Sequence, residues 1–161
     1  MKEKKEISIS YILYPDASHL DEIEQNLLQR AKQISEKAYA PYSNFLVSAC
    51  LYLSNGEIVE GVNQENASYP LGLCAERVAF FSAGVLHPNI TIEKVLIIAK
   101  KRESDYQFVS PCGACRQVMF EFEEKQNRPI EVILASTTGK ILKIPSVALL
   151  LPFHFGQALL L

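Results

Sequence analysis

The stretch CAERVAFFSAGVLHPNITIEKVLIIA, residues 74–99, decides the fold. Its first ten residues, 74–83, are rich in helix formers and are followed by Gly84, which is typical of a helix end. The continuous apolar run at 95–99 is typical of a strand that is buried on both faces. A helix followed by a central strand is a unit of folds in which helices cover a sheet. We therefore expect an α/β protein.

Further elements surround this unit on both sides. Apolar positions recur at three and four residues over 19–38 and predict an amphipathic helix. The other expected elements are a hairpin of strands 45–53 and 57–62 joined at Ser54-Asn55-Gly56, a helix at 115–124, a hairpin of strands 131–135 and 140–144 joined at Thr137-Thr138-Gly139, and a short terminal helix. This order predicts a mixed five-stranded sheet, whose last two strands are antiparallel, with helices on its faces.

Composition narrows the partners that the chain can have. The 161 residues include 16 basic and 18 acidic side chains, a net charge of −2, and no cluster of basic residues suggests a nucleic-acid partner. The apolar tail at 145–161 is too short and interrupted to span a membrane, so we expect it to be buried or to contact another subunit.

We expect residues 1–18 to be an N-terminal extension and 19–161 to form one domain. No signal-like leader is apparent, which predicts a reducing, cytoplasmic location.

The chain has four cysteines, and three of them form a pattern. Cys112 and Cys115 make a CxxC motif, which alone could be redox-active, metal-binding or accidental, and Cys74 stands at the start of the other short helix. Helix N-termini stabilise thiolates, and three thiolates suit a tetrahedral zinc site with one open position. Cys50 lies in an apolar strand, so we interpret it as a buried free thiol.

Charged residues follow the cysteines closely. Glu76 is two residues after Cys74, and zinc deaminases combine a Cys-x-Glu or His-x-Glu motif with a distant Pro-Cys-x-x-Cys motif. Such a glutamate is not a ligand; it takes a proton from water that the metal has made acidic and gives it to a leaving group. Three thiolates leave the zinc site with excess negative charge, so we expect Arg77 and Arg116 to donate hydrogen bonds to sulfur. Exposed helical side chains are the simpler alternative for all three residues.

These motifs carry a resemblance to a known family: the chain resembles the small, homotetrameric cytidine deaminases. The matching segments, which span about three quarters of the chain in the expected order, are Ala40-Pro41-Tyr42-Ser43-Asn44-Phe45 with Val47, Asn63-Gln64-Glu65-Asn66-Ala67, Tyr69-Pro70-Leu71-Gly72-Leu73-Cys74-Ala75-Glu76-Arg77, Ser110-Pro111-Cys112-Gly113-Ala114-Cys115-Arg116-Gln117, and Leu151-Pro152 with Phe155-Gly156. The resemblance implies a three-layer α-β-α sandwich, one Zn²⁺ per chain held by the three cysteines, and Glu76 as the proton shuttle.

The resemblance also implies contacts that spacing does not reveal. It assigns substrate binding to Phe45 on the pyrimidine ring, Asn63 and Glu65 on the ribose, Ala75, and Phe155 from a neighbouring subunit, and it places Ala67 and Tyr69 at subunit junctions. From the residues alone, we would interpret Asn63 as a turn residue and Phe45 as a core residue. Ser48, His154 and Gln157 depart from the family pattern. Because of the last two, the resemblance does not define the detailed shape of the pocket wall that a neighbouring subunit contributes.

The expected function is hydrolytic deamination of cytidine and 2′-deoxycytidine with release of ammonia, in pyrimidine nucleoside salvage. Two alternatives stay open at this point. The chain could act on a cytosine nucleoside antibiotic of the blasticidin type, or it could be a zinc-stabilised interaction module without turnover. A small neutral nucleoside fits the near-zero net charge better than a polynucleotide does.

Overall fold

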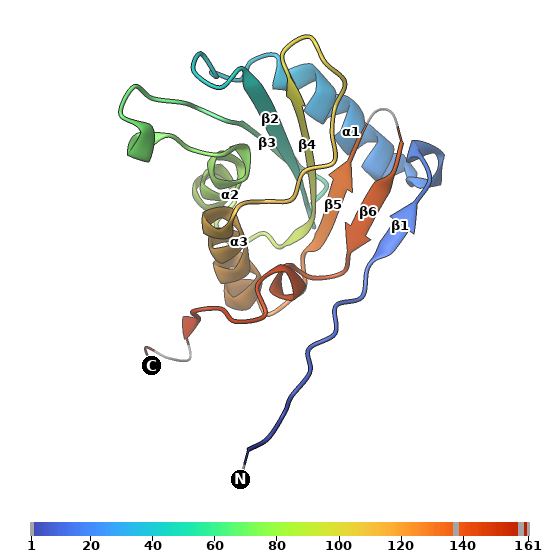
Figure 1. Ribbon diagram of the computed structural model, residues 1–161, viewed down its shortest axis with the longest axis vertical. Coiled ribbons are helices and arrows are strands. Elements are labelled where there is room, and N and C mark those ends of the chain that lie inside the picture. Colours follow the sequence, from blue (N-terminus) through green and yellow to red (C-terminus); the bar gives the residue numbers. More distant parts are fainter. Residues whose placement is uncertain (1, 137–138, 158–159, 161) are drawn as a thin grey trace.

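A computed structural model describes residues 2–136, 139–157 and 160, which build a mixed six-stranded sheet in the order β1-β6-β5-β4-β2-β3 (Figure 1). The strands are β1 (Ile12–Tyr14), β2 (Phe45–Leu53), β3 (Ile58–Val62), β4 (Ile92–Lys101), β5 (Glu131–Ala135) and β6 (Ile141–Ile144). The helices are α1 (Glu22–Ser35), α2 (Ala75–Leu86) and α3 (Gly113–Gln126), with short 3₁₀ turns η1 (Ala17–His19), η2 (Tyr69–Leu71) and η3 (Val147–Leu150). Only the β4–β5 pair is parallel within the described sheet.

Helices cover both faces of the sheet, which confirms the expected three-layer arrangement. Helix α1 lies behind the sheet in Figure 1, and its buried side chains share one core with Cys50 and Leu96. Helices α2 and α3 pack on the opposite face around Phe80 and Met119. Each described helix is too short or too polar to cross a membrane.

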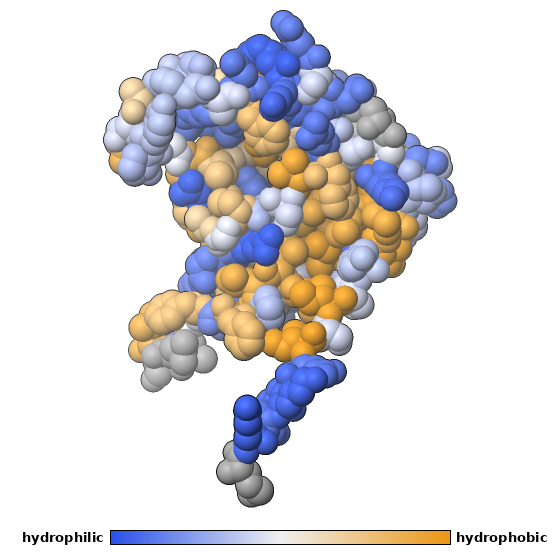
Figure 2. All heavy atoms as spheres, viewed as in Figure 1, coloured by the Kyte–Doolittle hydropathy of each residue, from blue (hydrophilic) through white to orange (hydrophobic). Residues whose placement is uncertain are grey.

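The sheet has six strands rather than the predicted five. The additional strand, β1, comes from the segment expected to be an extension and pairs antiparallel with β6. A strand of three residues carries almost no periodic signal, and its existence depends on the open edge of β6. The chain before it extends away from the body of the molecule and has a hydrophilic start (Figures 1 and 2).

The helix bounds also differ from the prediction: α1 is shorter than the expected 19–38, and α3 is longer than the expected 115–124. Helix α1 begins after Asp21, whose carboxylate accepts from Glu24 N while Glu24 accepts from Asp21 N, forming a capping box. Helix α2 does not stop at Gly84 but continues to Leu86. A Cβ at Gly84 would lie 3.2 Å from Phe122 on α3, so this glycine serves helix packing rather than helix termination. The predicted turn residues Thr137 and Thr138 lie outside the described part of the chain, whereas the antiparallel β5–β6 pair is as predicted.

Gly61 fixes the distance between β3 and the start of α2. A Cβ at this position would lie 2.4 Å from the carbonyl oxygen of Ala75 and 2.6 Å from the backbone nitrogen of Ala79. Backbone atoms cannot move aside as a flexible side chain can. The glycine therefore permits the close approach that places the first turn of α2 over the sheet.

We expect Gly61→Ala to lower the free energy of unfolding by about 1–3 kcal/mol because the added methyl group forces α2 away from β3. Urea denaturation monitored by circular dichroism measures this loss. Gly139→Ala is the matched control, since a Cβ there meets nothing within 4 Å, and its effect should stay within about 0.5 kcal/mol. Equal stability of the two variants would contradict this role for Gly61.

Candidate active site

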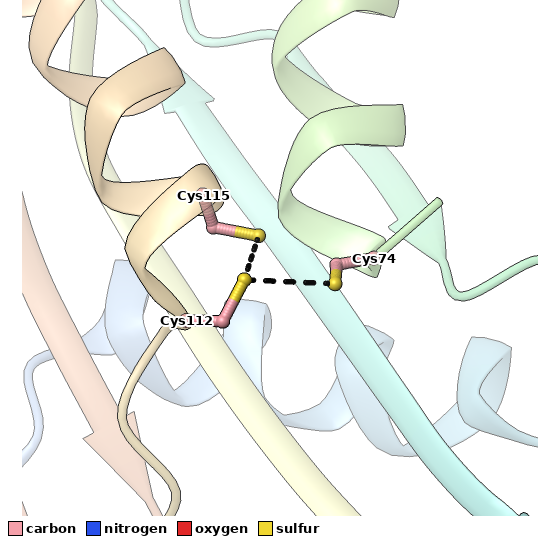
Figure 3. A group of neighbouring side chains, drawn as sticks. All are labelled: Cys74, Cys112 and Cys115. Atoms are coloured by element: carbon pink, nitrogen blue, oxygen red, sulfur yellow. Dashed lines mark hydrogen bonds between the residues drawn. The ribbon is translucent and has the colours of Figure 1, made fainter. Parts of the chain in front are cut away.

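Three cysteine sulfurs converge where α2 and α3 begin (Figure 3). The Sγ atoms of Cys74 and Cys112 are 3.9 Å apart, and those of Cys112 and Cys115 are 3.4 Å apart. All three lie within 4.8 Å of one another. The sulfurs come from separate parts of the chain but form one compact group, as the spacing predicts.

The helix starts favour the ionised form of these thiols. Cys74 and Cys112 occupy the N-cap positions of α2 and α3, and neither N-cap side chain makes a capping hydrogen bond. The free N–H groups and the positive end of the helix dipole stabilise negative charge there. Hydrogen bonding from Cys115, followed by that from Arg77, lowers the pKa of Cys74 to about 5, and the same contact with Cys74 raises the pKa of Cys115.

The donor set fits zinc. Zn–S bonds of about 2.3 Å in a tetrahedron place sulfurs roughly 3.8 Å apart, close to the separations seen here. Three sulfur ligands leave a fourth position open, which is the arrangement of a catalytic zinc site. Cys50 takes no part, because it is fully buried in the core on the α1 side of the sheet, where burial raises the pKa of its thiol to about 12.

Glu76 brings a carboxylate to the same place. It lies in the first turn of α2 and is 4% exposed, and its Oε2 atom has no hydrogen-bond partner among the described residues. Burial raises the pKa of this carboxyl above its usual value. A buried carboxylate with a free oxygen and a raised pKa is suited to exchanging protons with a ligand.

The two arginines have different partners. Arg77 donates from Nη2 to the carbonyl of Gly72 at 3.0 Å and also approaches Cys74 Sγ at 4.0 Å. Arg116, by contrast, makes its hydrogen bonds with oxygen atoms instead of sulfur: Pro111 O at 2.8 Å, Leu150 O at 3.0 Å and Ser110 Oγ at 2.9 Å. The expected hydrogen bond from Arg116 to sulfur is therefore wrong. This side chain ties the loop before Cys112 to the C-terminal segment.

A pocket of about 640 Å³ opens in front of the cysteines. Its walls come from β2, β4, the segment between β3 and α2, the first turn of α2 and the loop before α3. They include Ser43, Phe45, Val47, Asn63, Gln64, Glu65, Tyr69, Gly72, Leu73, Cys74, Glu76, Arg77, Ile97, Val109, Ser110 and Cys112. Apolar and polar side chains thus meet beside a metal-binding cluster, as in many small-molecule sites.

Two predicted polar contacts lie in this pocket. Glu65 accepts hydrogen bonds from the backbone N–H groups of Tyr42 and Ser43 at 2.9 and 3.3 Å, and hydrogen bonding, first from Ser43, keeps the pKa of Glu65 below its usual value. The Asn63 amide bridges to β2, accepting from Val47 N and donating to Phe45 O. The sequence did not predict that two backbone N–H groups hold the Glu65 carboxylate. The Ser43-Asn44 pair that follows Pro41 is a turn signal and could have indicated it.

The remaining predicted residues lie around the pocket or apart from it. Ala75 is fully buried in the core and does not line the pocket. Phe155 is 58% exposed and lies outside the pocket of its own chain, where its backbone contacts Gln117 on α3. Ala67 and Tyr69 are exposed, and Tyr69 also lines the pocket.

Comparison with known proteins agrees with this geometry. Residues 21–128 match the family model of the cytidine and deoxycytidylate deaminase zinc-binding region. The chain belongs to the cytidine and deoxycytidylate deaminase family. It is 40% identical over 133 residues to a cytidine deaminase of Sporosarcina psychrophila, covering 83% of this chain and 91% of that protein. A cytidine deaminase of Halalkalibacterium halodurans is also 40% identical, covering 81% of this chain and 92% of that protein.

A solved structure of a cytidine deaminase has a fold similar to that of this deaminase. The crystal structure of a cytidine deaminase from Burkholderia pseudomallei superposes with a TM-score of 0.70 at 40% identity. The match covers 81% of this chain and 98% of that one. The family model describes a zinc-binding region, and the three cysteines of this chain are positioned to bind the zinc ion.

Proposed function

We propose that the protein catalyses the zinc-dependent hydrolytic deamination of cytidine and 2′-deoxycytidine to uridine and 2′-deoxyuridine, with release of ammonia. One observation carries the proposal: a buried glutamate with a free carboxylate oxygen lines a nucleoside-sized pocket together with Cys74 and Cys112, two of the three clustered thiols. Membership of the deaminase family and the named relatives support the same reaction.

Glu76 moves the protons in this reaction. Zinc held by Cys74, Cys112 and Cys115 supplies the acidification of water that hydrolysis near neutral pH requires. Glu76 takes one proton as water adds to C4 of the pyrimidine and delivers it to N3. It then takes the second water proton from the C4 hydroxyl and delivers it to the amino group, which leaves as ammonia when the C4–N4 bond breaks and the C4 carbonyl forms. Its burial favours the protonated form and so keeps the carboxyl able to act as an acid after it has acted as a base.

The walls of the pocket orient the nucleoside. Phe45 lies against the pyrimidine ring, and Asn63 and Glu65 bind the ribose hydroxyls. Glu65 stays ionised and is held by two backbone N–H groups, which makes it a fixed acceptor. Ala75 contributes through its backbone, because its side chain is buried in the core.

A homotetramer completes the site. Phe155 from a neighbouring subunit closes the pocket, and Ala67 and Tyr69 lie at the subunit junctions. The exposure of Phe155 and Tyr69, 58% and 73% in the isolated chain, supports this arrangement. We assign catalysis to residues 19–161, with β1 completing the edge of the sheet, and place the enzyme in the cytoplasm in pyrimidine nucleoside salvage.

A comparison of substrates tests this function. We expect zinc-loaded protein to release ammonia from cytidine and 2′-deoxycytidine with a higher kcat/KM than from a blasticidin-type cytosine nucleoside, because Asn63 and Glu65 are placed to bind an ordinary ribose. A higher kcat/KM on the antibiotic would overturn the substrate assignment while leaving the reaction type intact.

A further inference from the structure

The edge of the sheet at β1 is open. Strand β1 pairs with β6 on one side, and the structure describes no strand on its other side. The preceding residues, 2–11, run away from the body in an extended conformation (Figure 1) and make no backbone hydrogen bond to another described segment. An open edge of this kind exposes N–H and C=O groups that can pair with another strand.

The odd-numbered positions 7–13 are all apolar and exposed, as is Ile12 on the opposite face at 54%. Ile7, Ile9, Tyr11 and Leu13 are 56%, 46%, 57% and 47% exposed, and alternation in an extended chain places them on one face. Tyr11 and Leu13 line a groove of about 550 Å³ together with Phe108 and Leu142. Figure 2 shows apolar surface gathered over this end of the sheet. Four exposed apolar side chains in a row need a partner surface.

Charges bracket the apolar segment. Residues 2–6, Lys-Glu-Lys-Lys-Glu, precede it, and Pro15 and Asp16 follow it, whereas residues 7–14 carry no charge. Proteins that keep an edge unpaired place charges or proline within it. Here the charges limit the length of pairing but leave the segment itself free to pair.

We propose that residues 7–13 pair antiparallel with the same segment of a second copy of this chain, joining two sheets edge to edge. Self-pairing around a two-fold axis keeps the sum of the paired residue numbers constant. Matching all four apolar side chains places Ile7 opposite Leu13 and Ile9 opposite Tyr11, with Ser10 opposite itself.

The same register matches charges. Lys4 of one copy then lies opposite Asp16 of the other, and both side chains are exposed in the single chain, at 84% and 56%. Pro15 has no N–H and ends the ladder at this point. This charge match favours a second copy over an unrelated partner. The contact does not depend on the deaminase reaction, so each proposal can fail without the other.

Cysteine cross-linking tests the register in the zinc-loaded full-length protein. Opposed residues of an antiparallel pair have Cα atoms about 4.5–5.5 Å apart, within the range of a disulfide, so Ser10→Cys should form a covalent dimer on mild oxidation. Ser8→Cys is the matched control, because its two copies would lie roughly 13 Å apart. Wild type measures the background from the natural cysteines on the same non-reducing gel.

A second variant tests the apolar contact itself. Ile9→Lys places a charge in the apolar row, and in the Ser10→Cys background we expect it to lower the yield of covalent dimer at least about tenfold. An unchanged yield on adding Ile9→Lys, or equal cross-linking of Ser10→Cys and Ser8→Cys, would overturn the proposal. A Ser10→Cys protein that gives no more covalent dimer than the wild type would do the same.

Discussion

Replacing Glu76 by glutamine is expected to lower kcat by at least about 10²- to 10⁴-fold while zinc stays bound. Glutamine keeps the size of the side chain but cannot take or deliver a proton. The three sulfurs are untouched, so the metal site should persist. Steady-state turnover of cytidine together with the zinc content of the same sample measures both halves of the prediction.

Glu93→Gln is a suitable control, because Glu93 lies exposed on β4 and is not among the residues of the pocket. Its kcat should match that of the wild type. If Glu76→Gln binds a full complement of zinc and turns over cytidine at the wild-type rate, Glu76 does not shuttle the protons.

Replacing Glu24 by alanine is expected to lower the free energy of unfolding by about 3–5 kcal/mol, since it removes the anion from a buried ion cluster. Glu24 is fully buried and accepts from Lys143 at 2.5 and 2.6 Å and from Lys94 at 2.9 Å. Without Glu24, the ammonium group of Lys143 has no carboxylate partner among the described residues. The loss corresponds to a fall in Tm of roughly 6–20 °C by differential scanning calorimetry.

The same cluster predicts how stability depends on pH. Burial alone would raise the pKa of Glu24, but the hydrogen bonds from Lys143 and Lys94 outweigh it and hold this pKa below the ordinary value of 4.5. Its contribution is therefore present above that value and is lost as the pH falls through the lower pKa of the folded state. Wild-type Tm should fall more steeply below about pH 4.5 than that of Glu24→Ala.

Glu22→Ala in the same first turn of α1 is the control for Glu24, because Glu22 is exposed, and it should change stability by about 0.5 kcal/mol or less. A Glu24→Ala variant as stable as this control would show that the buried cluster contributes nothing to folding. Parallel acid profiles of wild type and Glu24→Ala would separately contradict the pH dependence.

Features of the site that depend on local sequence could be predicted. The cysteines stand next to helix starts that the pattern of helix formers and Pro111 already indicate, and a short spacing ties Glu76 to Cys74. The apolar run at 95–99 similarly identifies β4 because burial on both faces requires it. In each of these cases the residues and their immediate neighbours determine the outcome.

Features that depend on distant contacts could not be predicted. Arg116 donates a hydrogen bond to the carbonyl oxygen of Leu150, which lies 34 positions further along the chain, and no spacing rule predicts this contact. Strand β1 exists only because the edge of β6 is free to accept it. Gly84 looks like a helix end in the sequence, but its role is to admit Phe122 from another helix. Tertiary packing overrides the local signal at each of these positions.

The same limit applies to the pocket. Asn63 resembles a turn residue, yet its amide joins β3 to β2 through two hydrogen bonds while facing the pocket. Phe45 resembles a core residue, yet it lines the pocket at the start of β2. Only the resemblance to a family singled out these two positions, because side-chain type alone does not distinguish a substrate contact from a structural one.

The zinc content of the purified protein, measured together with the loss of cytidine absorbance on the same sample, tests the central claim most directly. We predict one zinc per chain and a rapid loss of absorbance, matched by release of one ammonia for each cytidine consumed. Protein that is replete with zinc but leaves cytidine, 2′-deoxycytidine and related cytosine nucleosides unchanged would contradict the claim and would indicate a zinc-stabilised interaction module instead.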